Sequence, residues 1–309
     1  MTAMVPNGVR HLEGHRGPVY ALGSWQGGVL SGSGDGTVAL WDLDTGAAVA
    51  LARVDQAVFA LAVTTPGDAL LIGTEGGGLH VIDLVRRCET QHLSSHRRGI
   101  FRIVALADDR VACAGGDGTL SVWRSRSDPQ GPKLDLLRQL PLAEGKLRDV
   151  AASTDGRFVA VASGDGPVHV LDGRDLNEHL TLAGHEGGST SLAWHPTKPV
   201  LLSGGKDGHL RAWHAADGRP LLAQAAHRGG IYALAFHPGG RTLASASRDK
   251  TAKLWTADGL EPMARLDRTA GGHTHSVNAL CWMDGRLITA GDDRRVIAWA
   301  VPPTTVGHG

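Results

Sequence analysis

The stretch SGSGDGTVALWDLDTG, at residues 31–46, decides the fold because related segments recur along the whole chain. They are IGTEGGGLHVID from residue 72, CAGGDGTLSVWR from 113, VASGDGPVHVLD from 161, SGGKDGHLRAWH from 203, SASRDKTAKLWT from 245 and TAGDDRRVIAWA from 289. The Trp, or the aliphatic residue in its place, falls at positions 41, 82, 123, 171, 213, 255 and 299. This regular spacing predicts seven copies of one structural unit.

Each unit has the alternation that is typical of β-strands. In TVALWD, residues 37–42, Val38 and Leu40 share one face while Trp41 lies on the other. Two further short apolar stretches, VYALGSW and GGVLSGS, precede it, and turn residues such as Asp, Thr and Gly separate the stretches. We therefore expect three or four antiparallel strands per unit, with most of the 43 glycines in turns.

A unit of about 40 to 45 residues with Gly-His near its start and Trp-Asp near its end resembles the WD repeat. Gly-His or a near match occurs at Gly14-His15, Ser95-His96, Gly184-His185, Ala226-His227 and Gly272-His273, and the literal Trp-Asp occurs at Trp41-Asp42. The resemblance covers nearly the whole chain. It implies an all-β, seven-bladed β-propeller whose blades are four-stranded antiparallel sheets.

We expect one domain, residues 1–309, with repeats at about 14–45, 54–85, 95–125, 146–174, 184–216, 226–258 and 272–301. By analogy with the family, residues 7–13, NGVRHLE, should form the outer strand of the seventh blade. Such an N-terminal strand would close the ring and cover the exposed edge of the last blade.

Several units contain His, Ser or Thr, Asp and Trp in a fixed order. Four near-identical copies argue against a catalytic serine triad, which occurs once per active site and needs an oxyanion hole. Similarity to the family implies a structural relay, in which Asp accepts from His and a strand hydroxyl accepts from the Trp indole. The relay residues are His15, Ser31, Asp35 and Trp41; His96, Asp117 and Trp123; His185, Ser203, Asp207 and Trp213; His227, Ser245, Asp249 and Trp255; and His273, Thr289, Asp293 and Trp299.

Three units depart from the relay pattern. In the third, Cys113 stands where the others have the hydroxyl, so we expect a weaker relay there. The second has Gly76 in place of Asp and an aliphatic residue in place of Trp, and the fourth has Val161 and Leu171. We expect the second and fourth blades to rely on apolar packing alone.

The composition excludes several classes of protein. The 31 Lys and Arg residues balance 31 Asp and Glu residues, which argues against binding a nucleic acid or a membrane through overall positive potential. The three Cys residues form no CxxC pair, which fits a reducing cytoplasm. The N-terminus lacks the basic start and apolar run of a signal peptide, so we expect a cytoplasmic protein. His273 and His275 are a close pair without a visible third ligand, so no metal site and no cofactor is expected.

The family resemblance implies that partners dock on the narrow face of the ring, where one position per blade lies five residues after the relay His. That position holds Tyr20, Phe59, Phe101, Arg148, Thr190, Tyr232 and Asn278, where Phe59 and Arg148 are aligned on the strand that follows because blades two and four have no relay His. These residues include four of the six Phe and Tyr residues of the chain. The β-propensity of aromatic residues is one explanation. The other is function, because aromatic residues and Arg anchor protein interfaces.

Two further positions per blade should face the same way. They add Lys146, three residues after the His position, and Lys206, Arg248 and Asp292, each before the turn Asp. The face then divides into an apolar sector on blades one to three and a basic sector on blades four to six. This division predicts a protein partner with an apolar segment and flanking acidic residues.

Three functions compete. A non-catalytic protein-interaction scaffold fits the resemblance and the absence of a unique catalytic set. Nucleic-acid binding by Lys146, Arg148, Lys206 and Arg248, with stacking on Tyr232, is an alternative that zero net charge disfavours. A propeller hydrolase needs several convergent polar groups at the central channel, where only Glu75, Asn278 and Asp292 are candidates. The insertion at 125–137 is expected to be a loop on the opposite face.

Overall fold

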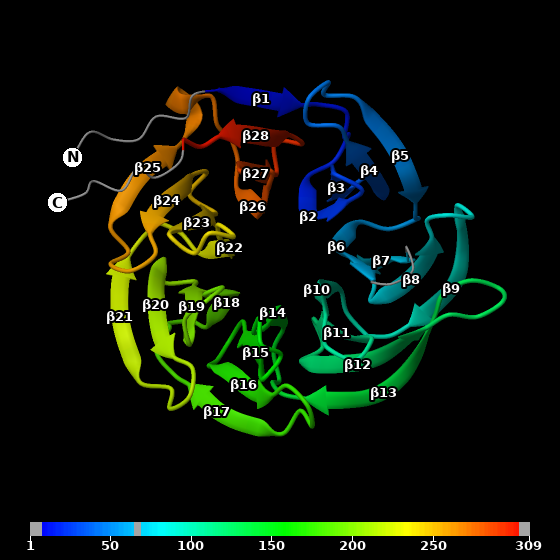
Figure 1. The fold of residues 1–309 in the computed structure, drawn as a ribbon, viewed down its shortest axis with the longest axis horizontal. Helices are drawn as coiled ribbons and strands as arrows, with labels where there is room; N and C mark the ends of the chain where they lie inside the picture. The colour runs from blue at the N-terminus through cyan, green and yellow to red at the C-terminus, as the bar shows by residue number, and fades with distance from the viewer. Residues whose placement is uncertain (1–7, 65–68, 303–309) are drawn as a thin grey trace.

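The chain folds into seven four-stranded antiparallel sheets that stand as blades around a central axis (Figure 1). The computed structural model describes residues 8–64 and 69–302. The expected all-β, seven-bladed propeller is confirmed. In the described part of the chain, one three-residue 3-10 turn, η1 (Arg268–Ala270), is the helical content, and no helix is long and apolar enough to cross a membrane.

Each blade runs from an inner strand beside the axis to an outer strand at the rim (Figure 1). In that order, the first three blades contain β2 (Val19–Trp25), β3 (Gly28–Ser33), β4 (Thr37–Trp41) and β5 (Ala48–Arg53); β6 (Val58–Thr64), β7 (Ala69–Thr74), β8 (Gly78–Asp83) and β9 (Cys88–Ser94); and β10 (Ile100–Ala105), β11 (Arg110–Gly115), β12 (Thr119–Arg126) and β13 (Lys133–Pro141). Residues 65–68 of the second expected repeat lie outside the described residues.

The remaining blades follow the same order. They contain β14 (Leu147–Ala152), β15 (Phe158–Ser163), β16 (Val168–Asp172) and β17 (Glu178–Leu182); β18 (Ser189–Trp194), β19 (Val200–Gly205), β20 (His209–His214) and β21 (Pro220–Ala225); β22 (Ile231–Phe236), β23 (Thr242–Ser247), β24 (Ala252–Thr256) and β25 (Pro262–Leu266); and β26 (Val277–Met283), β27 (Arg286–Gly291) and β28 (Val296–Ala300) with β1 (Val9–Leu12) outside it.

The N-terminal strand closes the ring. β1 pairs antiparallel with β28, with Val9 opposite Trp299 and Leu12 opposite Val296. Leu12 is 1% exposed and packs in a cluster that joins blade one to blade seven. The expected closing strand is confirmed over Val9–Leu12, while residue 7 of the predicted range lies outside the described residues.

The hydrophobic core lies between the blades. Seven clusters of buried residues each join two neighbouring blades, so every sheet is covered on both faces. Second strands such as β3 and β7 are buried along their whole length, whereas outer strands such as β5 are largely exposed. This arrangement leaves the inner strands free to present side chains to the central axis.

The insertion in blade three is shorter than the sequence predicts. Residues 125–126 continue β12 and residues 133–137 belong to β13, which leaves 127–132 as the connection. Blade two holds this region in place: Thr90 Oγ1 donates to the carbonyl of Pro132 at 2.6 Å, and Leu134 N donates to Gln91 Oε1 at 2.7 Å. The prediction of a loop over 125–137 is therefore wrong at both ends, because β9 supplies partners that extend the hairpin.

Candidate functional site

A β-bulge interrupts the inner strand of every blade at its second residue. In blade one, Val19 pairs with Ser33 and Ala21 pairs with Gly32, so Tyr20 has no partner in the ladder. The corresponding unpaired residues in the other blades are Phe59, Phe101, Arg148, Thr190, Tyr232 and Asn278. A bulge redirects the side chain of the extra residue. The repeated bulge therefore turns one side chain per blade toward the axis.

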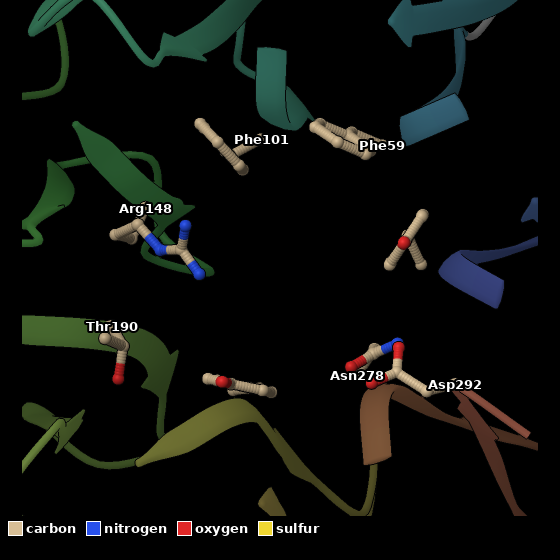
Figure 2. Close-up of a pocket in the computed structure, with 8 residues that line it drawn as sticks. Phe59, Phe101, Arg148, Thr190, Asn278 and Asp292 are labelled. Carbon is tan, nitrogen blue, oxygen red and sulfur yellow. The ribbon is translucent and has the colours of Figure 1, made fainter. Parts of the chain in front are cut away.

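These seven side chains and Asp292 line one cavity of about 340 Å³ at the centre of the ring, which we call the funnel (Figure 2). The funnel lies where the inner strands begin. The five positions that follow a relay His by five residues, and the aligned positions Phe59 and Arg148, therefore all contribute to a single cavity. The other residues that the sequence predicts on this face, Lys146, Lys206 and Arg248, are exposed and do not line the funnel.

Three aromatic rings form a continuous wall on one side of the funnel. The centres of the Tyr20 and Phe59 rings are 5.0 Å apart and the rings are nearly perpendicular, while Phe59 stacks on Phe101 at 5.5 Å. Burial, together with the carboxylates of Asp292 and Glu75, raises the pKa of Tyr20. The phenol is therefore neutral at physiological pH, and the wall presents an apolar surface with one hydroxyl.

Arg148 extends this wall with a positive charge. Its guanidinium lies over the Phe101 ring, and Figure 2 shows the side chain reaching from its strand toward the middle of the cavity. The guanidinium has no hydrogen bond or ion pair with any residue in the described part of the chain. Burial lowers the pKa of Arg148, but guanidinium stays protonated in proteins. Its five N–H donors are therefore available to a ligand.

The side of the funnel opposite Arg148 is polar. Asn278 Nδ2 donates to Asp292 Oδ1 at 2.7 Å and to the carbonyl of Val19 at 3.1 Å, so one amide links blade seven to blade one. Thr190 lies on the same side as Arg148 in Figure 2, and its Oγ1 donates to the carbonyls of Gly204 and Ile231, so its hydroxyl hydrogen is not available in the cavity. The Asn278–Asp292 pair faces Arg148 across the funnel in Figure 2.

The sequence did not indicate Asp149, which follows the funnel residue Arg148 and makes contacts between neighbouring blades. Its carboxylate accepts from Leu192 N at 2.8 Å and Val150 N at 2.9 Å, and Arg102 Nε lies 3.3 Å away. Burial raises the pKa of Asp149, while Arg102 and the two backbone N–H groups counter that shift. Asp149 thus connects blades three, four and five directly beneath Arg148.

The relay hydrogen bonds lie away from the funnel, inside the blades. In blade six, His227 Nδ1 is 3.0 Å from Asp249 Oδ2, His227 Nε2 is 2.7 Å from Ser245 Oγ, and Trp255 Nε1 donates to Ser245 Oγ at 2.8 Å. Blades five and seven repeat this arrangement. Blade one has the same bonds to Ser31, with His15 Nδ1 farther from Asp35 Oδ2, at 3.5 Å. Because both ring nitrogens of His273 are engaged in its relay, the His273–His275 pair cannot form a metal site as it stands.

Blade three keeps a complete relay, contrary to the expectation from Cys113. Ser121, directly opposite Cys113 on the next strand, supplies the hydroxyl. Its Oγ lies 2.9 Å from His96 Nε2 and accepts from Trp123 Nε1 at 2.8 Å. The prediction of a weaker relay rested on a missing hydroxyl, and the cross-strand neighbour provides it.

Blades two and four are not held by apolar packing alone, which was the expectation for both. His80 Nδ1 lies 2.7 Å from Glu89 Oε1 in blade two, and His169 Nδ1 lies 2.8 Å from Glu178 Oε1 in blade four. Each pair joins the third strand of its blade to the outer strand. Blade two also caps its altered turn, because Gly76 N donates to Gln56 Oε1 at 2.8 Å.

The chain is similar in sequence to proteins that contain WD repeats. The family model for the WD domain, G-beta repeat, matches residues 7–42, 177–214, 218–256 and 264–300. WD repeat-containing protein 90 of Xenopus tropicalis is 29% identical over 157 residues, which span 49% of this chain and 8% of that protein. The U5 small nuclear ribonucleoprotein 40 kDa protein of Bos taurus is 28% identical over 209 residues, which span 65% of this chain and 58% of that protein.

Among solved structures, the WD40 β-propeller domain of Doa1 superposes with a TM-score of 0.83 over 98% of both chains, at 19% identity. At this identity the likeness concerns the fold. The matched repeats, the seven four-stranded blades and the closing N-terminal strand show that the chain belongs to the WD-repeat family of β-propeller proteins.

Proposed function

We propose that this protein is a non-catalytic scaffold that binds a segment of a partner protein in and around the funnel. The docking residues of the proposal are Tyr20, Phe59, Phe101, Lys146, Arg148, Lys206, Tyr232, Arg248, Asn278 and Asp292. One observation carries it: the unpaired guanidinium of Arg148 lies beside a wall of three aromatic rings in one cavity. Family membership supports a role in protein interaction in general.

The funnel chemistry suits an apolar side chain followed by a carboxylate. An apolar side chain can pack against Tyr20, Phe59 and Phe101, which are each half-buried and so offer surface to a ligand. A carboxylate fits Arg148, because guanidinium binds carboxylates through two parallel hydrogen bonds. The exposed Lys146, Lys206 and Arg248 would attract further acidic residues of the same segment.

The lining of the funnel favours binding over catalysis. It contains no Ser, Cys or His among the described residues. The Thr190 hydroxyl is hydrogen-bonded to two carbonyls, and Asp292 is engaged by Asn278. A hydrolase would need a nucleophile or an activated water next to a general base. We therefore propose that the protein has no enzymatic activity.

The relatives suggest what kind of assembly such a scaffold joins. The name of one relative assigns it to the U5 small nuclear ribonucleoprotein, and another, cwf17 of Schizosaccharomyces pombe, is named a pre-mRNA-splicing factor. By analogy, we propose that this chain is one subunit of a multi-protein assembly. A reducing compartment is part of the proposal, since Cys113 and Cys281 carry free thiols whose pKa burial raises to about 12. We propose the cytoplasm, and the names of these relatives make the nucleus the alternative.

Nucleic-acid binding is the second candidate, because Lys146, Lys206 and Arg248 are exposed. It predicts that an oligonucleotide binds with an affinity that falls steeply as salt concentration rises. The first proposal predicts no such binding. Gel-shift titrations at several salt concentrations therefore distinguish the two.

Affinity capture from the native cell tests the scaffold proposal. The wild type is compared with a Tyr20→Ala, Phe59→Ala, Phe101→Ala variant and with a matched control, Leu136→Ala, Leu137→Ala, which alters exposed apolar residues of outer strand β13. We expect the control to retain the wild-type partners and the funnel variant to lose them. Equal recovery by all three folded proteins would contradict the proposal.

A further inference from the structure

Blade two carries two histidines and a glutamate whose side chains meet on its outer two strands. His80 on β8 lies directly opposite His92 on β9, and Glu89 stands opposite Ile82, two residues further along β8. One ligand atom from each of His80, Glu89 and His92 lies within 4.8 Å of the others. The imidazole rings stack with their centres 4.1 Å apart and an angle of 10° between their planes.

Glu89 fixes the orientation of His80. Its Oε1 lies 2.7 Å from His80 Nδ1, so in neutral His80 the Nδ1–H donates to the carboxylate and Nε2 carries the free lone pair. Histidines that bind metals in proteins commonly have this arrangement, in which one ring nitrogen donates to a carboxylate and the other binds the ion. His80 is also the less mobile ligand, since its side chain is 13% exposed.

The absence of a side chain at Gly78 leaves room beside both rings. A Cβ atom at Gly78 would lie 3.0 Å from His92 Nε2 and 3.6 Å from His80 Nε2. The two Nε2 atoms therefore border the same space, and Thr74 Oγ1 would lie 3.0 Å from that Cβ position as well. Two imidazole nitrogens and nearby oxygen atoms form a donor set that suits zinc and similar divalent transition metals.

We propose that His80 and His92 bind a divalent transition-metal ion of the zinc class through their Nε2 atoms, with Glu89 holding His80. Because the rings are nearly parallel, His92 has to turn about its Cβ–Cγ bond so that both lone pairs meet at one ion. His92 is exposed and has no hydrogen bond with any residue in the described part of the chain, so this rotation gives up only its stacking on His80. Water molecules complete the coordination shell.

Blade four provides an internal comparison. It has the same His–Glu pair in the same register, His169 with Glu178. Thr181 stands opposite His169 where blade two has His92, and its hydroxyl donates to Glu178 at 2.7 Å. Pro167 occupies the position that corresponds to Gly78. Blade four therefore keeps the strand-linking pair but lacks both the second nitrogen ligand and the space, and the proposal assigns it no metal.

The ion would connect the third strand of blade two to its outer strand. Blade two lacks the relay hydrogen bonds that link the strands within each of its two neighbouring blades, because Gly76 and Ile82 replace the Asp and the Trp. A ligand that binds the folded state alone stabilises it. Metal binding should therefore raise the melting temperature of the protein, which gives a readout independent of the binding measurement.

Calorimetric titration with Zn²⁺ alone tests the proposal, using full-length protein without a polyhistidine tag at about pH 7.5, where imidazole is mainly neutral. The informative variants are His92→Thr, which installs the residue of blade four, and Gly78→Ala, which fills the space and removes no ligand. The matched controls are His179→Ala, an exposed histidine on β17, and Cys88→Ser, which removes the exposed thiol next to Glu89.

We expect one Zn²⁺ site in the wild type and in both controls, with a Zn²⁺-dependent rise in melting temperature. His92→Thr should weaken binding by at least about tenfold and abolish the rise, and Glu89→Gln should weaken binding by about 10- to 100-fold. Melting without metal shows that each variant is folded. Gly78→Ala should also weaken binding, because its methyl group fills the space beside both Nε2 atoms. Absence of binding in the wild type, or unchanged binding in His92→Thr, would overturn the proposal.

Discussion

The guanidinium carbon of Arg148 lies 4.7 Å from the centre of the Phe101 ring, and this contact joins the charged and aromatic parts of the funnel. A cation over an aromatic face is held in place without using its hydrogen-bond donors. Arg148 is therefore oriented by Phe101 while its N–H groups stay available.

Ser121 should be essential to the relay of blade three. Replacing Ser121 by Ala removes the hydroxyl that both His96 and Trp123 contact, and we expect a loss of about 1 to 3 kcal/mol in the free energy of unfolding. Urea denaturation measures it. The double variant Cys113→Ser, Ser121→Ala recreates the Ser31–Ala39 arrangement of blade one and should recover most of that loss. A double variant no more stable than Ser121→Ala would contradict this account.

The closing strand should contribute strongly to stability. Leu12→Ala removes a side chain that is 1% exposed, and core Leu to Ala changes cost about 2 to 5 kcal/mol. Val9→Ala, on the same strand but 38% exposed, is the matched control and should cost less. Deletion of residues 1–13 should lower the melting temperature more than either substitution. If the truncated chain melts at the full-length temperature, β1 does not close the ring.

Asp149 should be needed for the packing of blades three to five. Asp149→Ala leaves the buried Leu192 N–H without its acceptor, and we expect destabilisation of about 3 kcal/mol. Asp149→Asn keeps an acceptor oxygen and should cost less. Asp108→Ala, at an exposed carboxylate, serves as the control. Chemical denaturation that shows no difference between Asp149→Ala and Asp108→Ala would be incompatible with this role.

Stability should fall as the pH falls below about 6.5. Burial lowers the pKa of His15, His185 and His227, and this outweighs the opposing effect of the neighbouring carboxylates. The unfolded chain then binds protons more readily than the folded one, so this stability is present above the unfolded pKa of about 6.5 and is lost as pH falls toward the folded values.

The relay carboxylates act in the same direction at lower pH. Burial alone would raise the pKa of Asp249, but hydrogen bonds from His227 and Thr251 hold it well below its usual range. A depressed carboxyl pKa stabilises the folded state until the pH falls through that value. Urea denaturation should show little change in stability between about pH 8 and pH 7 and a loss of stability from about pH 6.5 to pH 5. A protein that becomes more stable over this range would contradict the protonation states assigned here.

The repeat pattern predicts the fold well because each copy of the pattern forms one blade. Trp41 and its counterparts mark the third strand of a blade, so seven markers indicate seven blades. The funnel positions could also be found from the sequence. A bulge falls at the same register in every blade, so a fixed offset from the relay His reaches Tyr20 and Asn278, and alignment on the following strand reaches Arg148 in blade four, which has no relay His.

Other features depend on contacts between strands, which a fixed offset along the chain cannot show. Ser121 replaces the hydroxyl missing at Cys113 only because the two residues are cross-strand neighbours. The role of Asp149 depends on Leu192 in the next blade.

The central claim is that the funnel binds an apolar residue followed by an acidic one, and selection from a random peptide display library tests it most directly. Peptides selected on the wild type should combine an aromatic or aliphatic residue with Asp or Glu. They should bind Arg148→Glu at least about tenfold more weakly and should bind the control Leu136→Ala, Leu137→Ala unchanged. Selected peptides that lack acidic residues, or that bind wild type and Arg148→Glu equally, would contradict the claim.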